Sequence, residues 1–209
     1  MKKILSFILI LAIVFSFAAC GKSENNTAKE FTRGTVSGNR YENEFLGLGI
    51  ELGESWVFYT DEQIATLYGL TTDFLEEDFG EYLKNATIIY DMQAADTESN
   101  NNVGINFEKL TELGEVQTTN METFVSSLMP TLANSLESVG CTDVSFELVE
   151  YDIDGKTFYG GKTKADLQGF ELYQALICVK CEGYVSNITI TSVGEDRIDS
   201  ILDGFFVVK

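Results

Sequence analysis

The sequence predicts an α+β fold, a three-layer α/β/α sandwich with a mostly antiparallel central sheet. Most apolar segments after residue 45 are short and are separated by turn residues, which is typical of strands in hairpins. One segment, residues 121–139, instead repeats apolar residues at helical spacing. Residues 170–181 are apolar on both faces of an expected strand, so covering structure is expected on both sides of the sheet.

The first elements are expected to be a hairpin and a helix. Phe45–Leu52 and Trp56–Tyr59 read as two strands joined by a glycine-containing turn. Thr60 is the expected N-cap of a helix whose first turn is acidic. Gly69 interrupts this helix, and a second helical piece is expected over residues 73–83.

The middle of the chain predicts two strands followed by a long helix. Thr87–Met92 and Val103–Leu110 are the strands, and the polar residues 93–102 between them predict a long loop. Thr119–Glu122 fits a capping box at the start of the helix, and Gly140 fits its end. The apolar stripe of this helix is expected to be a core face.

The last part predicts two hairpins and a short helix. Asp154-Gly155 is a type I′ turn signal between strands at 144–151 and 157–163. Strands 170–181 and 184–193 follow, and then a helix over Glu195–Leu202. In the strand 170–181, Phe170, Leu172, Leu176 and Cys178 share one face, and Tyr173, Ala175, Ile177, Val179 and Cys181 share the other.

This order of elements resembles the Mog1/PsbP-like fold, which also occurs in DcrB-type lipoproteins. The resemblance covers residues 41–209. It rests on the element order, on the Phe45-Leu46-Gly47-Leu48 opening with Trp56 after it, and on the closing Ile198-x-x-Ile201-Leu202-x-x-Phe205. Members of this family are mostly accessory or adaptor proteins, so the resemblance implies a non-enzymatic role and names no partner.

The N-terminus predicts export and lipidation. Met1-Lys2-Lys3 is followed by an apolar stretch shorter than the roughly 20 residues of a membrane-spanning helix. Phe17-Ala18-Ala19-Cys20-Gly21 resembles a bacterial lipobox, with Phe17 where leucine is usual. We therefore expect residues 1–19 to be a signal peptide, residues 20–40 a flexible tether, and residues 41–209 a single domain. Lipidated Cys20 would anchor this domain at the extracytoplasmic face of the cell membrane.

Composition excludes several chemistries. The chain has no histidine, which excludes Ser-His-Asp and Cys-His catalysis and the usual catalytic zinc centres. A net charge of −19 makes nucleic acid an improbable partner. Cys178 and Cys181 have C-x-x-C spacing, but residues three apart in a strand point to opposite faces. Together with Cys141 they are expected to be structural, and no cofactor or metal is expected.

The densest acidic cluster is the only binding candidate besides Cys20. As a helix, residues 73–81 would carry a stripe of carboxylates: Asp73, Glu76, Glu77, Asp78 and Glu81. Such a stripe can be a solvated face, a docking face for a basic partner, or a weak divalent-cation site. A stripe offers few oxygens to any one ion, so no metal site is predicted.

Three functions fit these observations. The favoured one is a non-enzymatic binding or accessory module, a monomeric domain that acts through a protein partner. The first alternative is a small-ligand carrier whose pocket lies between sheet and helix and uses Trp56, Phe58 and tyrosines. The second is a carboxylate-dependent hydrolase acting on wall sugars. No catalytic residue is predicted.

Lipidation at Cys20 can be tested directly. We expect Cys20→Ser to abolish incorporation of a fatty-acid probe and to leave the signal peptide uncleaved, because the thiol is the acceptor of the lipid. Metabolic labelling followed by gel analysis measures both effects. Labelling that persists in the variant would refute the assignment.

Overall fold

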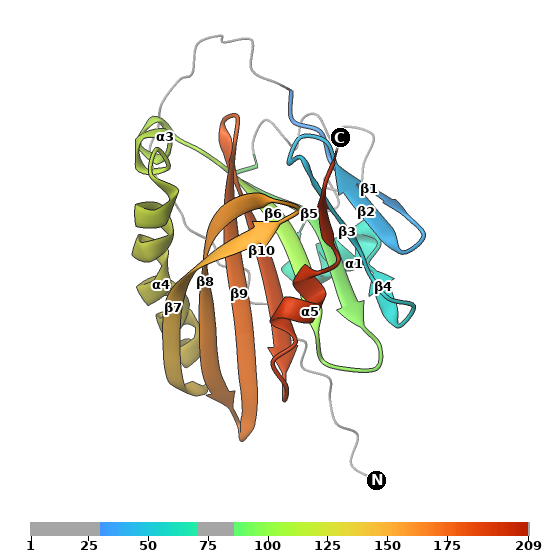
Figure 1. Cartoon of the computed structure of the whole chain (residues 1–209), viewed down its shortest axis with the longest axis vertical. Coiled ribbons are helices and arrows are strands. Elements are labelled where there is room, and N and C mark those ends of the chain that lie inside the picture. The colour runs from blue at the N-terminus through green and yellow to red at the C-terminus, as the bar shows by residue number, and fades with distance from the viewer. Residues whose placement is uncertain (1–29, 71–85, 209) are drawn as a thin grey trace.

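The computed structural model describes residues 30–70 and 86–208, which form two antiparallel sheets and four helices (Figure 1). The large sheet has the strand order β4-β5-β6-β10-β9-β8-β7, and the small sheet has the order β1-β2-β3-β11. The large-sheet strands are β4 (Trp56–Phe58), β5 (Ile88–Asp96), β6 (Asn102–Lys109), β7 (Cys141–Ile153), β8 (Lys156–Leu167), β9 (Phe170–Cys181) and β10 (Tyr184–Val193). The small-sheet strands are β1 (Thr35–Ser37), β2 (Arg40–Asn43), β3 (Leu48–Glu51) and β11 (Phe205–Val207). The helices are α1 (Asp61–Tyr68), α3 (Glu112–Gln117), α4 (Met121–Ser138) and α5 (Ile198–Leu202).

The two faces of the large sheet are covered by different kinds of structure (Figure 1). On one face α4 packs over β7, β8 and β9, and its apolar stripe forms a core with Leu176 and Val185. On the same face α1 covers β5, where Ile64 packs with Tyr90. The small sheet and α5 pack on the opposite face. The antiparallel sheet is as predicted, but the α/β/α sandwich is not confirmed, because a second sheet covers that face in the described residues.

The first strands of the chain differ from the predicted ones because they form the small sheet. β3 pairs with β2 and β11, whereas β4 pairs with β5, so the predicted hairpin between 45–52 and 56–59 does not form. The folded part also begins before Tyr41, since β1 and β2 occupy part of the predicted tether. Residues 30–40 contain few large apolar side chains, and their order comes from hairpin pairing within the small sheet and from the hydrogen bonds of Arg33 and Gly34 to Asp91, which composition did not indicate.

The connection between β5 and β6 is shorter than predicted. β5 continues to Asp96, and its residues Gln93 and Ala94 are buried. The Tyr68 hydroxyl of α1 donates a hydrogen bond to Gln93 Oε1 over 3.1 Å. A polar residue is therefore accommodated in the strand because the covering helix supplies its partner.

The helix ends agree closely with the predicted signals. Thr60 caps α1 in a capping box with Gln63, and Gly69 ends the helix with φ 63°. α4 is capped by Asn120, whose Oδ1 accepts a backbone N–H of the first turn over 2.9 Å, and not by Thr119. The short helix α3 was not predicted, and the predicted helical piece at 73–83 lies outside the described residues.

α4 lies close to the sheet because β8 contains glycine at the contact. The predicted apolar stripe is buried as expected: Phe124, Val125, Leu128, Met129, Leu132 and Leu136. A Cβ added at Gly161 would collide with the sulfur of Met129. Glycine leaves the space that the Met129 side chain fills, so the helix packs closely on β8.

β9 is buried on both faces, as its sequence predicts. Leu176 and Cys178 pack under α4, and Ala175 and Ile177 pack in the core shared with the small sheet. Cys181 contacts that second core and so lies on the opposite face from Cys178. The C-x-x-C spacing therefore does not bring the two sulfurs together.

Aspartate substitutions in β9 test whether both faces exclude water. Leu176→Asp places a charge under α4, and Ile177→Asp places one under the small sheet, where both native side chains are fully buried. We expect each to lower the free energy of unfolding in urea by about 3–5 kcal/mol. Phe170→Asp, on the same strand but 63% exposed, is the control and should change it by less than about 0.5 kcal/mol. A silent substitution at 176 or 177 would show that the face in question is open to solvent.

Candidate functional site

The site residues predicted from sequence lie outside the described part of the chain. Cys20 precedes residue 30, and the acidic set Asp73, Glu76, Glu77, Asp78 and Glu81 lies between residues 71 and 85. Among residues 30–70 and 86–208, no group of three or more histidine, cysteine or acidic side chains could hold a metal ion. In the same residues no helix is long and apolar enough to cross a membrane.

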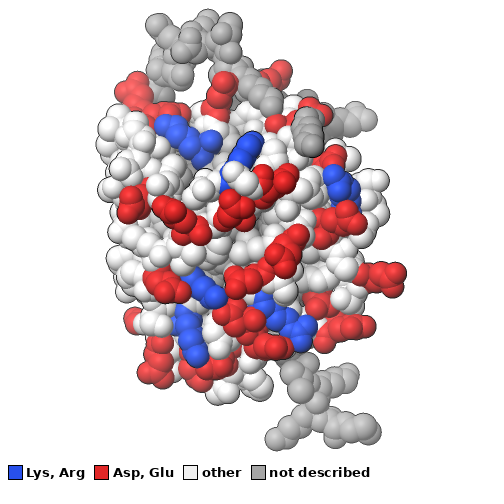
Figure 2. All heavy atoms as spheres, in the orientation of Figure 1, with Lys and Arg blue, Asp and Glu red and all other residues white. Residues whose placement is uncertain are grey.

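Charge alone does not mark one site on the molecule. The chain carries a net charge of −19, and acidic side chains are spread over the face shown in Figure 2, with basic ones set among them. A distributed negative field keeps copies of the chain apart and attracts basic partners. Exposed acidic side chains therefore do not locate a site. The features that can are buried carboxylates, grooves, and strand edges whose backbone N–H and C=O groups are unpaired.

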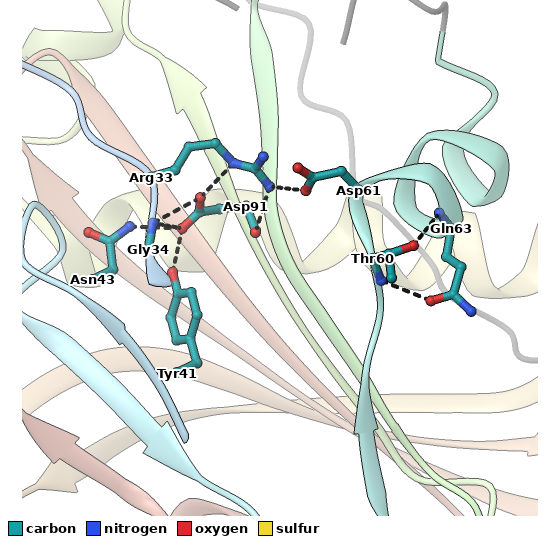
Figure 3. Close-up of polar contacts among 8 residues, drawn as sticks. All are labelled: Arg33, Gly34, Tyr41, Asn43, Thr60, Asp61, Gln63 and Asp91. Atoms are coloured by element: carbon teal, nitrogen blue, oxygen red, sulfur yellow. Dashed lines mark hydrogen bonds and ion pairs between the residues drawn. The ribbon is translucent and has the colours of Figure 1, made fainter. Parts of the chain in front are cut away.

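One buried carboxylate, Asp91, joins the N-terminal segment to the large sheet (Figure 3). It lies at a bulge in β5 and points toward the small sheet. Its oxygens accept hydrogen bonds from Gly34 N (3.1 and 3.2 Å), Arg33 Nε (3.2 Å) and Asn43 Nδ2 (2.8 Å). The Tyr41 hydroxyl donates a further short hydrogen bond to it. These donors occupy the acceptor capacity of the carboxylate.

Arg33 pairs with two carboxylates in this Asp91 cluster. Arg33 Nη2 also pairs with Asp61 Oδ1 at the start of α1, at 2.9 Å. Burial lowers the pKa of Arg33, but the two carboxylates outweigh burial and raise that pKa overall. Burial and then the charge of Asp91 raise the pKa of Tyr41, so its hydroxyl stays protonated and keeps donating. The buried Asp91 is fully hydrogen-bonded and paired with Arg33, and we assign the cluster a structural role.

The second buried carboxylate, Glu108, lies on the opposite face of the large sheet. It stands on β6 between Ile88 and Val185, on the face covered by the helices. The residue is only 4% exposed, and burial raises its pKa to about 7. Asp91 and Glu108 are therefore separated by the sheet. They do not form the pair of carboxylates flanking one bond that a wall-sugar hydrolase requires.

Polar side chains near Glu108 form a short hydrogen-bonded row across three strands. Cys178 Sγ on β9 donates to Asn187 Oδ1 on β10 over 3.4 Å, and Asn187 Nδ2 donates to Asn106 Oδ1 on β6 over 3.3 Å. Burial, followed by the charge of Glu108, raises the pKa of Cys178 to about 12. The thiol therefore stays protonated and is a poor nucleophile.

Two adjoining grooves lie between α4 and the sheet. The larger has a volume of about 490 Å³ and is bounded by the start of α4, by β8 and by the end of β9 with Cys178 and Lys180. The smaller, about 180 Å³, lies between Val125 of α4 and Leu148 of β7. Glu122 and Tyr159 line both. Neither groove contains Trp56 or Phe58, which lie on β4 at the other edge of the sheet, so of the predicted aromatic lining only a tyrosine is found there.

The outer edge of the large sheet borders the smaller groove. Phe146 and Leu148 of β7 lie on the α4 side of this edge and are each 47% exposed. The cross-strand neighbour of Leu148 is Gly161, so no side chain on β8 covers it. β7 pairs only with β8 among the described strands. We call Phe146, Leu148, the free edge of β7 and the smaller groove the β7 surface.

Carboxylates lie on both faces of the strand that carries the β7 surface. The exposed acidic residues Glu122, Glu150 and Asp152 lie on the α4 side with Phe146 and Leu148, and Glu147 lies on the opposite face of β7. On the neighbouring strand, Lys162 pairs with Asp196 at 2.7 Å and Lys164 pairs with Glu171 at 2.5 Å. The β7 surface therefore combines an apolar centre with an acidic rim. Sequence reasoning recognised the strand but not its exposure, which depends on its place at the edge.

Comparison with known proteins gives structural likeness only. No protein-family model matches the chain, and no curated protein matches it. A cyanobacterial PsbP (CyanoP) from Synechocystis sp. PCC 6803 is 15% identical, with a TM-score of 0.45 over 91% of this chain and 98% of that one. LpqN, involved in cell envelope biogenesis of Mycobacterium tuberculosis, is 8% identical, with a TM-score of 0.39 over 78% and 83%. A protein from Bacteroides thetaiotaomicron is 8% identical, with a TM-score of 0.40 over 83% and 50%. All three TM-scores lie below 0.5, so the function proposed below depends on the residues of this chain.

Burial of Glu108 predicts a specific pH dependence of stability. Its pKa in the folded state is about 7, above the ordinary 4.5, so between these values the folded state holds a proton that the unfolded state has lost. The stabilisation is complete below pH 4.5 and is lost as the pH rises through 7. Relative to Glu108→Gln, the native chain should lose on the order of 2–3 kcal/mol between pH 4 and pH 8 in urea denaturation.

The exposed Glu147→Gln variant controls for the loss of one negative charge. It should follow the native pH profile. Parallel profiles for the native chain and Glu108→Gln would mean that Glu108 ionises normally and is in contact with water.

Proposed function

We propose that this chain is a lipid-anchored accessory module outside the cell membrane that binds a protein partner and catalyses no reaction. The observation that carries the proposal is the β7 surface. Half-exposed Phe146 and Leu148 lie beside a groove and are surrounded by carboxylates. An apolar centre inside a charged rim is the usual anatomy of a protein–protein interface.

The anchor would restrict where the partner can be. Only nine residues lie between Cys20 and Glu30, where the described chain begins, so at full extension Glu30 would remain within about 35 Å of the lipidated residue. Arg33 and Gly34 then fasten the chain to β5, which is far from β7 in the strand order. The attachment therefore leaves the β7 surface free for a neighbouring protein of the envelope.

The larger groove supports a second candidate function, the carriage of a small ligand. Its volume of about 490 Å³ lies within the range of roughly 300–1,000 Å³ usual for ligand sites. Its lining is divided about equally between polar and apolar surface, and Lys180 is already held by Glu115 at 2.9 Å. We prefer protein binding at the adjoining edge, because it would bury the exposed side chains of Phe146 and Leu148, which a ligand in the larger groove would leave exposed.

Site-specific photo-cross-linking in intact cells tests the proposed binding. A photoreactive phenylalanine analogue at position 146 should give one discrete adduct with a partner protein, because Phe146 lies in the proposed interface. The same analogue at position 170, where the native Phe170 is 63% exposed at the start of β9, is the matched control and should give none. Absence of an adduct at 146, or the same adducts at both positions, would contradict the proposal.

A further inference from the structure

We infer that the partner presents an extended basic segment that adds to β7 as an eighth strand of the large sheet. This inference rests on the proposed function and specifies the chemistry of its partner. It follows from three properties of the β7 surface: a long unpaired backbone edge, an apolar pair of side chains on that edge, and a uniform sign of charge.

The outer edge of β7 is long and unpaired. The strand has 13 residues, and its neighbour in the sheet is β8 alone. Within the described chain, no backbone hydrogen bond joins residues 141–153 to any segment other than β8. An edge of this kind presents a row of free N–H and C=O groups, which is a template for another strand.

The hairpin turn identifies the residues whose backbone groups face outward. Asp154 and Gly155 have φ values of 53° and 79°, as a two-residue type I′ turn requires. Such a turn is closed by a hydrogen-bonded pair, here Ile153 and Lys156, and pairs alternate along the ladder. The odd-numbered residues of β7 therefore bond to β8. The N–H and C=O groups of the even-numbered residues point away from β8, toward the open edge: Phe146, Leu148, Glu150 and Asp152.

β7 lacks most of the features that protect edge strands. Natural edges are blocked by proline, by lysine, by a bulge or by being short. Residues 145–153 contain neither proline nor lysine. The bulge in this strand lies between Thr142 and Ser145, and the pairing beyond it is regular to the turn. What this edge has is carboxylates, which repel an acidic strand and accept a basic one.

The same charge argues against a second copy of this chain as the partner. Two copies joined edge to edge would gather Glu147, Glu150 and Asp152 of both copies along one junction. Like charges opposite each other in a sheet are destabilising, and the net charge of −19 adds to the repulsion. A segment with apolar side chains opposite Phe146 and Leu148, and basic ones opposite the carboxylates, satisfies both features of the edge.

Peptide binding to the full chain in zwitterionic detergent tests this inference. The probe is the capped octapeptide Lys-Val-Lys-Val-Val-Lys-Val-Lys, which along residues 145–152 places valine opposite Phe146 and Leu148 and lysine opposite the carboxylates, and its control replaces each lysine with glutamate. We expect micromolar binding of the lysine peptide by calorimetry and none of the control. Leu148→Pro should weaken binding about tenfold or more relative to Leu148→Ala, because proline removes an outward N–H that β8 does not use.

A charge variant keeps the test valid even if the proline variant misfolds. Glu147→Lys with Glu150→Lys leaves the backbone intact and should weaken binding of the lysine peptide about tenfold. Equal binding of both peptides, binding of neither, or affinity unchanged in the charge variant would overturn strand addition. A dimer of the chain that Leu148→Pro abolishes would overturn it in favour of a second copy. A cross-link between position 146 and a partner protein does not depend on how the peptides bind. Strand addition can therefore fail while the proposed protein binding still holds.

Discussion

The fold depends on the neutralisation of one buried carboxylate. Asp91 lies in a β5 bulge beneath the small sheet, and an unpaired charge there would destabilise the protein by several kcal/mol. Arg33, Gly34, Tyr41 and Asn43 supply the donors, and all four come from the first residues of the described chain. Satisfying Asp91 therefore holds the N-terminal segment and β2 against the large sheet. The small sheet, held in this position, covers the hydrophobic core between the two sheets.

The exposure of β7 follows from the way the other elements cover the sheet. On the helical face, contact between Met129 and Gly161 places α4 on β8, and Leu148 stays half exposed beside it. On the opposite face, the small sheet is fastened through Asp91 on β5, next to the β4 edge. The two edges of the large sheet therefore differ: β4 adjoins the attachment of the N-terminal segment, and β7 has no strand beside its outer edge among residues 30–70 and 86–208. This asymmetry makes β7 the surface available to a partner.

Local signals allowed much of the fold to be predicted. The Asp154-Gly155 turn, the capped helices and the doubly apolar strand β9 depend on neighbouring residues, and their patterns were sufficient. The small sheet could not be predicted in this way, because β1 and β2 are short and polar and because β11, which completes the sheet, comes from the other end of the chain. Asp91 looked like any polar residue of a strand, since its burial comes from a bulge and from donors about 50 residues away. The exposure of Phe146 and Leu148 depends on the order of strands, which the alternation of side chains does not reveal.

Strand addition at β7 is tested most directly by observing the contacts between the backbones. Isotope-edited nuclear magnetic resonance of the labelled chain with the unlabelled lysine–valine peptide measures which protons of the two molecules lie close together. If the peptide adds to β7 as a strand, its backbone protons will lie close to the backbone protons of Phe146, Leu148 and Glu150. Contacts confined to side chains of the groove between α4 and the sheet, with none to the backbone of β7, would contradict it.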